Sequence, residues 1–359
     1  MKTIDEIDSN FRLSADIPAD TVFCDPREEP FQCYGLVPNA EGSYCRLPLE
    51  MLPQCSEGVR HLAFHLAGAC VRFSTDSTYL AVLWELGESE NMAHFTPCGQ
   101  SGMELFEETE HGTISVGNFL PQMQPEGGCL LRQSALTPLG AGMRHYVLYL
   151  PLYNSISSLM LGFAPDAHLE VGRVPSIEAP LVFYGSSITQ GGCAAKTGSC
   201  YTTLLARRLD AAQINLGFSG NAKGEEVMAR YISGLKMSAF ILDYDHNAPS
   251  VDHLLRTHEP FFRIVREAQP QLPIVLVSKP DFDSAPEENR LRRNVILRTY
   301  ANALAIGDRH VYFVDGETFF GRTDRDLCTV DGCHPTSLGF LRMADQMEPV
   351  LRRALADRA

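Results

Sequence analysis

The fold is decided by the stretch LVFYGSSITQGG at residues 181–192, in which a compact apolar run leads directly into small polar residues. Four apolar residues ahead of a glycine are typical of a strand that is buried on both faces of a sheet. Residues 199–210 then carry apolar side chains at helical spacing. The stretch therefore predicts a strand, a polar turn and a helix, with hydroxyl side chains at the carboxyl end of the strand.

The same alternation of strand and helix continues to the end of the chain. Repeated βα units bury both faces of a sheet, and right-handed crossovers make its strands parallel. The C-terminal half is therefore predicted to be an α/β domain with a doubly wound parallel sheet, in which ligands bind outside the carboxyl ends of the strands. The first strand is predicted at 181–185, further strands at 214–218, 238–245, 273–282 and 310–316, and further helices at 224–234, 251–269, 286–306 and 336–356.

The region before this domain has a different pattern. Between residues 61 and 163, short β-rich runs are separated by clusters of Gly, Pro, Ser and Asp, which is typical of an antiparallel sandwich. Residues 164–180 are expected to cross between the two parts, which gives an all-β domain at 1–172 and an α/β domain at 173–359. The clearest of these runs are 69–75, 78–86, 103–108, 144–152 and 157–163.

Composition and net charge argue against some classes of function. The chain has 359 residues and a formal net charge of −14, so phosphate backbones and anionic lipid surfaces would repel it. No apolar run approaches the roughly 20 residues that cross a bilayer, and the first 20 residues lack the apolar core of an export signal. We therefore expect a cytoplasmic protein whose 11 cysteines are reduced, with no nucleic-acid or membrane partner.

Four clusters of small and polar residues lie where strands end or helices begin. They are 185–191, 215–221, 243–247 and 331–335. Together they contain a hydroxyl nucleophile, a histidine with an acidic neighbour, and side-chain and backbone hydrogen-bond donors. Acyl transfer requires this set of groups.

These clusters resemble the sequence blocks of the SGNH (GDSL-type) hydrolase superfamily. GSSIT at 185–189 stands at the first block, SGN at 219–221 at the second, Asn247 at the third, and DGCH at 331–334 at the last. The order and spacing fit over about 180 residues. The resemblance implies a flavodoxin-like arrangement of the parallel sheet.

The upstream region resembles one branch of the superfamily, in which a jelly-roll-like β-sandwich precedes the hydrolase domain. GMELF at 102–106 and HYVLYLPLYN at 145–154 carry this likeness, although the usual Gly-x-Asp-Leu-Tyr has Glu104 and Phe106 here. Ser186 departs from the Asp of the general first block, but this branch often has Ser at that place. The branch resembles carbohydrate esterases.

Carried over residue by residue, the resemblance implies that Ser187 is the nucleophile and His334 its base. Asp331 would accept a hydrogen bond from the imidazole and fix its tautomer. The oxyanion hole would comprise the backbone N–H groups of Ser187 and Gly220 and the side-chain amide of Asn247. No metal and no cofactor is implied.

Other interpretations of single motifs remain open at this point. Asp243 and Asp245 are alternative acids for the histidine, and His246 could line the cleft. A Cys328-x₄-Cys333-His334 cluster offers soft metal ligands without a clear fourth one. Cys193 and Cys200 flank the loop after the nucleophile and could pair under oxidation.

The function that we expect is a serine esterase that removes small O-acyl groups, acetyl foremost, from carbohydrates. Its partner would be a small-molecule or oligosaccharide ester. One alternative is an acyltransferase, a lipase or a thioesterase that uses the same three residues. Another is a carbohydrate-binding protein without catalysis, in which the sandwich binds the sugar.

Overall fold

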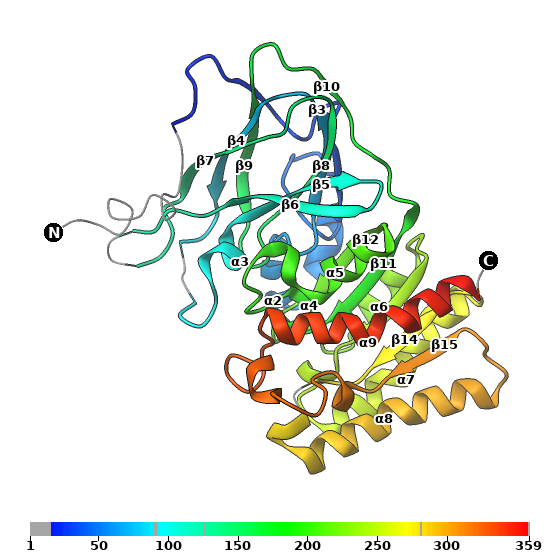
Figure 1. Cartoon of the computed structure of the whole chain (residues 1–359). Coiled ribbons are helices and arrows are strands. Elements are labelled where there is room, and N and C mark those ends of the chain that lie inside the picture. The colour runs from blue at the N-terminus through cyan, green and yellow to red at the C-terminus, as the bar shows by residue number, and fades with distance from the viewer. Residues whose placement is uncertain (1–15, 90–91, 125–126, 281, 358–359) are drawn as a thin grey trace.

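A computed structural model describes residues 16–89, 92–124, 127–280 and 282–357. The chain forms a β-rich part and a helix-rich part that pack against each other (Figure 1). Within the described residues, no helix combines the length and the apolar character that spanning a bilayer requires.

The C-terminal part contains a parallel five-stranded sheet in the order β12-β11-β13-β14-β15. Numbered from the first strand of this part, the order is 2-1-3-4-5, the flavodoxin-like arrangement. The prediction of an α/β, doubly wound parallel sheet is therefore confirmed. The strands are β11 (Ile177–Gly185), β12 (Ala211–Gly217), β13 (Ala239–Asp243), β14 (Ile274–Val277) and β15 (Val311–Val314).

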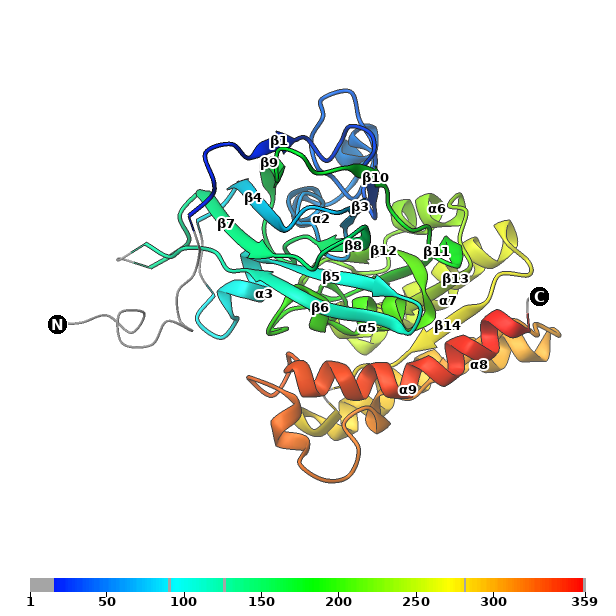
Figure 2. The same cartoon turned by 45° about the horizontal axis from the view of Figure 1, so that its top comes forward.

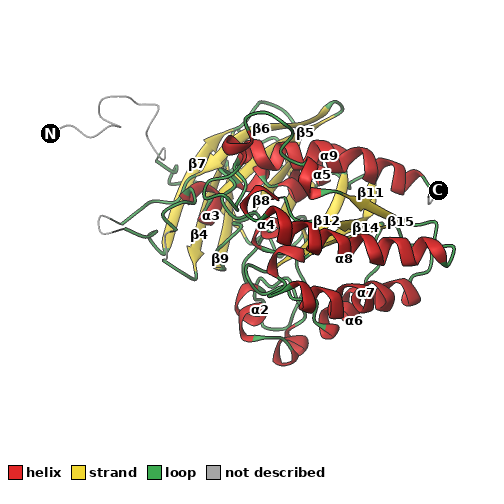
Figure 3. Ribbon diagram, turned by 90° about the horizontal axis from the view of Figure 1, so that it is seen from below, coloured by secondary structure: helices red, strands yellow, loops and turns green. Residues whose placement is uncertain are grey.

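Helices cover both faces of this sheet, which Figure 3 shows from below. One face packs against α5 and α9, and the other against α6, α7 and α8, each through a separate apolar core. Burial on both faces explains why the strands are continuous apolar runs. The helices are α4 (Ser187–Gln190), α5 (Tyr201–Leu209), α6 (Glu226–Ser233), α7 (Val251–Ala268), α8 (Pro286–Ala305) and α9 (Ser337–Ala356), with short 3-10 turns η3 (Thr197–Ser199), η4 (Asp245–Asn247), η5 (Phe282–Ser284), η6 (Gly316–Thr318) and η7 (Arg325–Cys328).

The N-terminal part is the expected antiparallel sandwich (Figure 2). One sheet has the order β1-β9-β4-β7, and the other β10-β3-β8-β5-β6, with β2 paired to β3. The strands are β1 (Val22–Cys24), β2 (Gln32–Tyr34), β3 (Cys70–Thr75), β4 (Tyr79–Leu86), β5 (Met103–Thr109), β6 (Gly112–Phe119), β7 (Arg132–Pro138), β8 (Arg144–Tyr149), β9 (Ile156–Phe163) and β10 (Leu169–Val171), with the helical turns η2 (Leu49–Gln54), α2 (Glu57–Leu62) and α3 (Pro97–Ser101).

The expected crossing at 164–180 contains regular structure. Leu169–Val171 pairs antiparallel with Phe73–Thr75, and β11 begins at Ile177. Backbone pairing with the edge of the sandwich therefore extends into this segment, whose Gly and Pro content suggested only a linker.

Part of the N-terminal region packs inside the α/β part. Cys45, Leu47 and Val59 belong to the same apolar core as Val182 and Leu242 of the parallel sheet. Arg46, which is completely buried, donates to the carbonyl oxygens of Asn215 and Gly217 at the end of β12, at 2.6 and 3.0 Å. Burial lowers the pKa of this guanidinium to about 10. Residues 45–63 precede the α/β part in the sequence, yet they complete the apolar packing on one face of its sheet.

The GMELF stretch lies at the seam between the two parts. The buried carboxylate of Glu104 accepts from Lys196 Nζ and from the backbone N–H of Gly198, the latter at 3.0 Å. Phe106 lies under the guanidinium of Arg207, 3.7 Å from the ring centroid. The GMELF motif of the sandwich therefore helps to position the loop that follows α4.

Candidate active site

Ser187 begins the single helical turn α4, directly after the central strand β11. Ser186 caps this turn, because its hydroxyl accepts from the backbone N–H of Ile188 at 3.1 Å. A Cβ atom at Gly185 would lie 2.0 Å from Thr189 Oγ1 and 2.5 Å from the carbonyl of Asp243, so only glycine fits the turn. The sequence GSSIT thereby folds into a tight strand-to-helix turn that holds Ser187 at the strand end.

The structure brings Ser187, His334 and Asp331 together across 147 residues of chain. Ser187 Oγ lies 2.9 Å from His334 Nε2, and His334 Nδ1 lies 2.8 Å from Asp331 Oδ2. The other Asp331 oxygen accepts from the backbone N–H groups of Cys333 and His334, at 3.0 and 2.7 Å. Gly332 between them has φ +83°, which glycine adopts without strain. This turn aims Asp331 at its own histidine.

The charges of these groups are mutually stabilising. The Cys333 thiol and the Asp331 carboxylate raise the pKa of His334 to about 9, against the effect of burial. Against the same effect, hydrogen bonds from the side chain and backbone of His334 lower the pKa of Asp331 to about 2. Asp331 is therefore ionised throughout the neutral range, and the imidazole is a strong base.

The loops that carry Gly220 and Asn247 are tied to the same region. Asn247 Nδ2 donates one hydrogen to the carbonyl of Phe218 at 2.9 Å, which leaves its second N–H for another acceptor. The backbone N–H of Ser219 donates to Gln190 Oε1 at 2.9 Å. Gly220 is exposed and has φ +66°, a conformation typical of glycine. The loops after β12 and β13 are thus fixed to each other and to α4.

The sandwich also contacts the turn that carries Ser187, which the sequence did not reveal. The buried hydroxyl of Tyr153 donates to the carbonyl of Ser187 at 3.0 Å. Gln190 Nε2 donates to the carbonyl of Leu152 at 3.2 Å. A Cβ at Gly192 would lie 2.9 Å from Tyr153 Oη and 3.3 Å from His334 Cδ2. Tyr153 lies in the HYVLYLPLYN stretch that carries the likeness to the sandwich branch, but nothing in the sequence indicated a contact with Ser187.

The two alternative acids are engaged elsewhere. Asp243 accepts from Thr189 Oγ1 and Tyr201 Oη at 3.0 and 2.7 Å, and burial raises the pKa of its carboxyl to about 7. Asp245 accepts from the backbone N–H of Lys279 at 3.1 Å and pairs with Arg292. Both carboxyls brace the loops under the site, whereas Asp331 contacts the imidazole.

Several thiols and imidazoles surround His334. Cys333 Sγ lies 3.1 Å from His246 Nε2, and against the effect of burial the His246 and His334 imidazoles lower the pKa of the Cys333 thiol to about 7. Cys328 is buried away from them, against Asp324 and Arg342. Of the soft ligands that the sequence grouped, Cys333 and His334 therefore lie together, whereas Cys328 lies apart from them. Cys193 and Cys200 are both free thiols.

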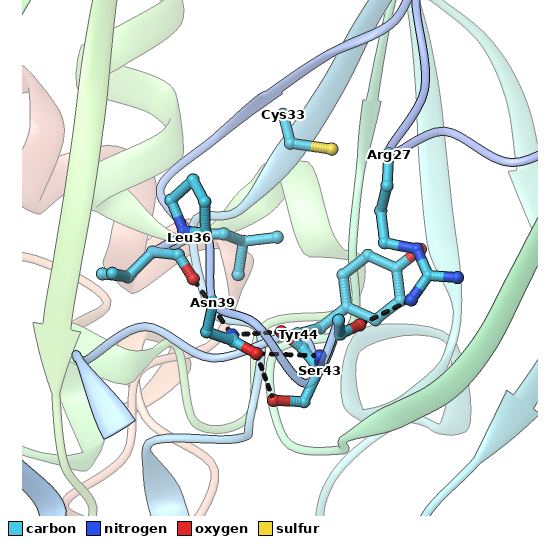
Figure 4. A pocket seen from close by; sticks show the side chains of 9 residues that line it. Arg27, Cys33, Leu36, Asn39, Ser43 and Tyr44 are labelled. Atoms are coloured by element: carbon cyan, nitrogen blue, oxygen red, sulfur yellow. Dashed lines mark hydrogen bonds between the residues drawn. The ribbon is translucent and has the colours of Figure 1, made fainter. Parts of the chain in front are cut away.

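A pocket of about 390 Å³ lies at the N-terminal segment, and Figure 4 shows its side chains. Asp25 and the carbonyl of Gly42 bind the Arg27 guanidinium at its rim, while Asn39 bonds to Ser43. The polar groups at this pocket are thus already engaged with the protein, and we assign it no ligand. It is lined by Arg27, Cys33, Leu36, Val37, Pro38, Asn39, Gly42, Ser43 and Tyr44.

Family models match both parts of the chain. Residues 178–352 match the GDSL-like lipase/acylhydrolase family, and residues 21–169 match the N-terminal domain of SGNH-type esterases that is named for its GxDLY motif. None of the curated proteins matches the chain by sequence.

Solved structures share the whole architecture. A protein described as a GDSL-like lipase from Bacteroides ovatus is 27% identical, with a TM-score of 0.83 over 94% of this chain and 98% of that one. The salicylyl-acyltransferase SsfX3 from a tetracycline biosynthetic pathway is 20% identical, with a TM-score of 0.74 over 95% and 98%. The acetyl xylan esterase Est2A from the rumen bacterium Butyrivibrio proteoclasticus is 14% identical, with a TM-score of 0.57 over 94% and 99%. By its family matches and its architecture, the chain belongs to the SGNH (GDSL-type) hydrolases, in the branch with an N-terminal β-sandwich.

Proposed function

We propose that this protein is a serine esterase that removes small acyl groups, acetyl foremost, from carbohydrate hydroxyls. Ser187 is its nucleophile, His334 its general base and Asp331 the residue that orients the imidazole. The observation that carries the proposal is the unbroken chain of hydrogen bonds from Ser187 Oγ through both ring nitrogens of His334 to Asp331, with distances of 2.9 and 2.8 Å.

The reaction follows from this chain of contacts. Because Nδ1 donates to Asp331, Nε2 is free to accept the Ser187 proton as Oγ attacks the ester carbonyl. The backbone N–H groups of Ser187 and Gly220, with the second N–H of Asn247, would hold the oxyanion. Nε2 then returns the proton to the leaving alcohol as the C–O bond breaks and the acyl-enzyme forms. Water, deprotonated by the same nitrogen, releases the acid and restores Ser187.

A pocket beside the turn that carries Asp331 and His334 suits an alcohol with many hydroxyls. Its volume is about 490 Å³, and it lies on the loop that flanks Asp331. Ser284 and Thr329 bring hydroxyl groups to its lining. The likeness to an acetyl xylan esterase supports the same substrate class. The lining residues are Asp283, Ser284, Phe320, Arg325, Asp326, Thr329, Val330 and Gly332.

The test is acetate release from acetylated xylo- or manno-oligosaccharides and from aryl acetates. Ser187→Ala should reduce kcat on the order of 10⁶-fold. The matched control is Ser186→Ala, which removes the neighbouring hydroxyl and only a helix cap. A fluorophosphonate should label the wild type at residue 187 and leave Ser187→Ala unlabelled. Full activity in Ser187→Ala, or an unlabelled wild type, would refute the proposal.

Acyl transfer to an acceptor other than water is the second candidate. The likeness to a salicylyl-acyltransferase, which spans both parts of the chain, favours it. Hydrolysis in the presence of rising concentrations of alcohols separates the two, because a transferase gives mainly the new ester. Predominant acid product at high alcohol concentration identifies an esterase.

A further inference from the structure

A second set of reactive side chains lies around His334, outside the proposed triad. His94, Cys193 and His334 each offer one ligand atom, and these three atoms lie within 4.8 Å of one another. The imidazole of His94 is also 5.9 Å from that of His334, and its Nε2 is 3.9 Å from Asp331 Oδ2. Three segments that are far apart in the sequence therefore converge on the imidazole that activates Ser187.

The packing of the sandwich against the hydrolase loop builds this convergence. Thr96 Oγ1 donates to the carbonyl of Ala195 at 2.6 Å, two residues from each ligand. A Cβ at Gly99 in α3 would lie 2.0 Å from the carbonyl of Ala194, so α3 and the loop with Cys193 are in direct contact. Cys193 is buried and has φ +70°, an uncommon conformation for a residue with a side chain. The fold thus fixes the thiol beside the imidazoles.

The ligand types select a class of ion. Thiolate and imidazole together suit Zn²⁺ and similar soft cations, and poorly suit Mg²⁺ or Ca²⁺. Bonds of about 2.0–2.3 Å place tetrahedral ligand atoms about 3.3–3.8 Å apart, so the side chains need to close by about 1 Å. Burial and the nearby Asp331 and Cys333 raise the pKa of the Cys193 thiol to about 12. A cation would offset those negative charges, and the thiol proton would leave to solvent.

We propose that His94, Cys193 and His334 form a binding site for a soft divalent cation, Zn²⁺ foremost, and that its occupation switches the esterase off. Both ring nitrogens of His334 are engaged, one by Ser187 and the other by Asp331. Whichever nitrogen ligates the ion, one of these two hydrogen bonds is lost. The inhibition rests on the proposed function, whereas the binding of the ion does not.

Among the described residues, two other groups of possible ligands compete with this set. His61 and His65 both direct Nε2 at Glu88 Oε1, at 3.2 and 3.3 Å. Gln190 Nε2, a donor, faces His65 Nδ1 at 3.3 Å, so the proton of a neutral His65 lies on Nε2, where a metal would bind. Cys333 forms the third group with Asp331 and His334, but its thiol faces His246. Both groups are therefore less suited to the ion.

The first experiment measures inhibition of aryl acetate hydrolysis by Zn²⁺ after treatment with a chelator, each variant being compared with its own uninhibited rate. Cys193→Ser and His94→Ala should each raise the half-inhibitory Zn²⁺ concentration by about 10–100-fold. His61→Ala should leave it unchanged. Wild-type inhibition in Cys193→Ser or in His94→Ala, or a shift in His61→Ala, would overturn the proposed ligand set.

The second experiment detects the ion without turnover. Ser187→Ala titrated with Co²⁺ should develop thiolate-to-cobalt charge-transfer absorption, which Ser187→Ala/Cys193→Ser should lack. Thermal unfolding of both variants checks that they are folded. No charge-transfer band in folded Ser187→Ala overturns the site, and a band without inhibition of the wild type overturns its inhibitory role. A wild type that hydrolyses no ester yet binds cobalt through Cys193 refutes the proposed function and leaves the metal site standing.

Discussion

The two halves of the proposed triad are held in opposite ways. The turn with Ser187 is buried, and both parts of the molecule brace it: Asn215 Nδ2 donates to the carbonyl of Thr189 at 2.7 Å, and Tyr153 donates to that of Ser187 at 3.0 Å. The loop with Asp331 and His334 lies at the surface, and most of its bonds are its own. Val330 N–H donates to the carbonyl of His334 at 2.9 Å, and Thr336 N–H to that of Cys328 at 2.9 Å.

The two sides of the site are therefore held in place by different parts of the molecule. Ser187 takes its position from the cores of both parts, so its geometry depends on residues far away in the sequence. His334 and Asp331 take theirs from a short turn, so their mutual geometry depends mainly on residues 328–336. Changes on the two sides should therefore have different consequences, and the four variants below test this in order of expected effect.

Asp331→Asn should have the largest effect. The amide cannot hold the imidazole in the tautomer that accepts from Ser187, so kcat should fall by about 10³–10⁴-fold. Stability should change little, because Asp331 is exposed. Kinetics and thermal unfolding measure the two effects, with the exposed Asp166→Asn as control. Retention of more than a tenth of wild-type kcat would mean that another acid orients His334.

Gly192→Ala should act on the braced side. The new Cβ would press on Tyr153 Oη and on His334 Cδ2, and a displacement of about 1 Å at the reacting atoms costs about 10²-fold in rate. Steady-state kinetics on an aryl acetate should show the loss in kcat. Gly234→Ala, where the nearest atom to a Cβ is 3.5 Å away, is the control and should keep wild-type kinetics.

Tyr153→Phe should remove the hydrogen bond between the sandwich and the turn that carries Ser187. The loss of one buried hydrogen bond should cost about 1 kcal/mol of folding free energy. We expect kcat to fall about tenfold with KM unchanged, since the hydroxyl contacts the backbone of Ser187. Denaturant unfolding and kinetics of this variant provide the measurement, compared with Tyr79→Phe, which removes a half-buried hydroxyl of the sandwich that bonds to Thr21 Oγ1 at 2.9 Å. A change confined to KM would show that Tyr153 contacts substrate instead.

Cys333→Ser should have the smallest effect, and only on the pH profile. The base must be neutral, so kcat/KM should rise with pH until His334 has lost its proton, at about pH 9. The Cys333 thiol contributes to raising that pKa, so replacing it should move the acidic limb to lower pH. A pH–rate profile of both proteins checks the sign, and an acidic limb that moves to higher pH would contradict it.

The fold could largely be predicted because its main signals are local. Each strand of the parallel sheet is an apolar run, and the structure has a strand in each predicted place. The strand predicted at 273–282 ends at Val277, the last residue that pairs with β15. Gly112–Phe119 was missed because most of its residues lie at the surface and form no apolar run.

The candidate site could be predicted only in part, because some of its residues reach it through packing rather than through a motif. Ser187, Asp331 and His334 stand in short motifs whose order the resemblance supplied, and their catalytic roles remain predictions. Tyr153, Gln190 and His94 gain their places at the site from the packing of one part on the other. No periodicity or motif in a single sequence encodes that packing, so it had to be observed.

The segment 45–63 determines where the chain can be cut without exposing the core of the α/β part. Because its apolar side chains and Arg46 fill one face of the parallel sheet, a fragment that starts at residue 173 would expose that face and lose the donor at the end of β12. The α/β part therefore cannot be exchanged as a unit without this segment. Engineering that swaps sandwiches between relatives should carry this segment along with the hydrolase half.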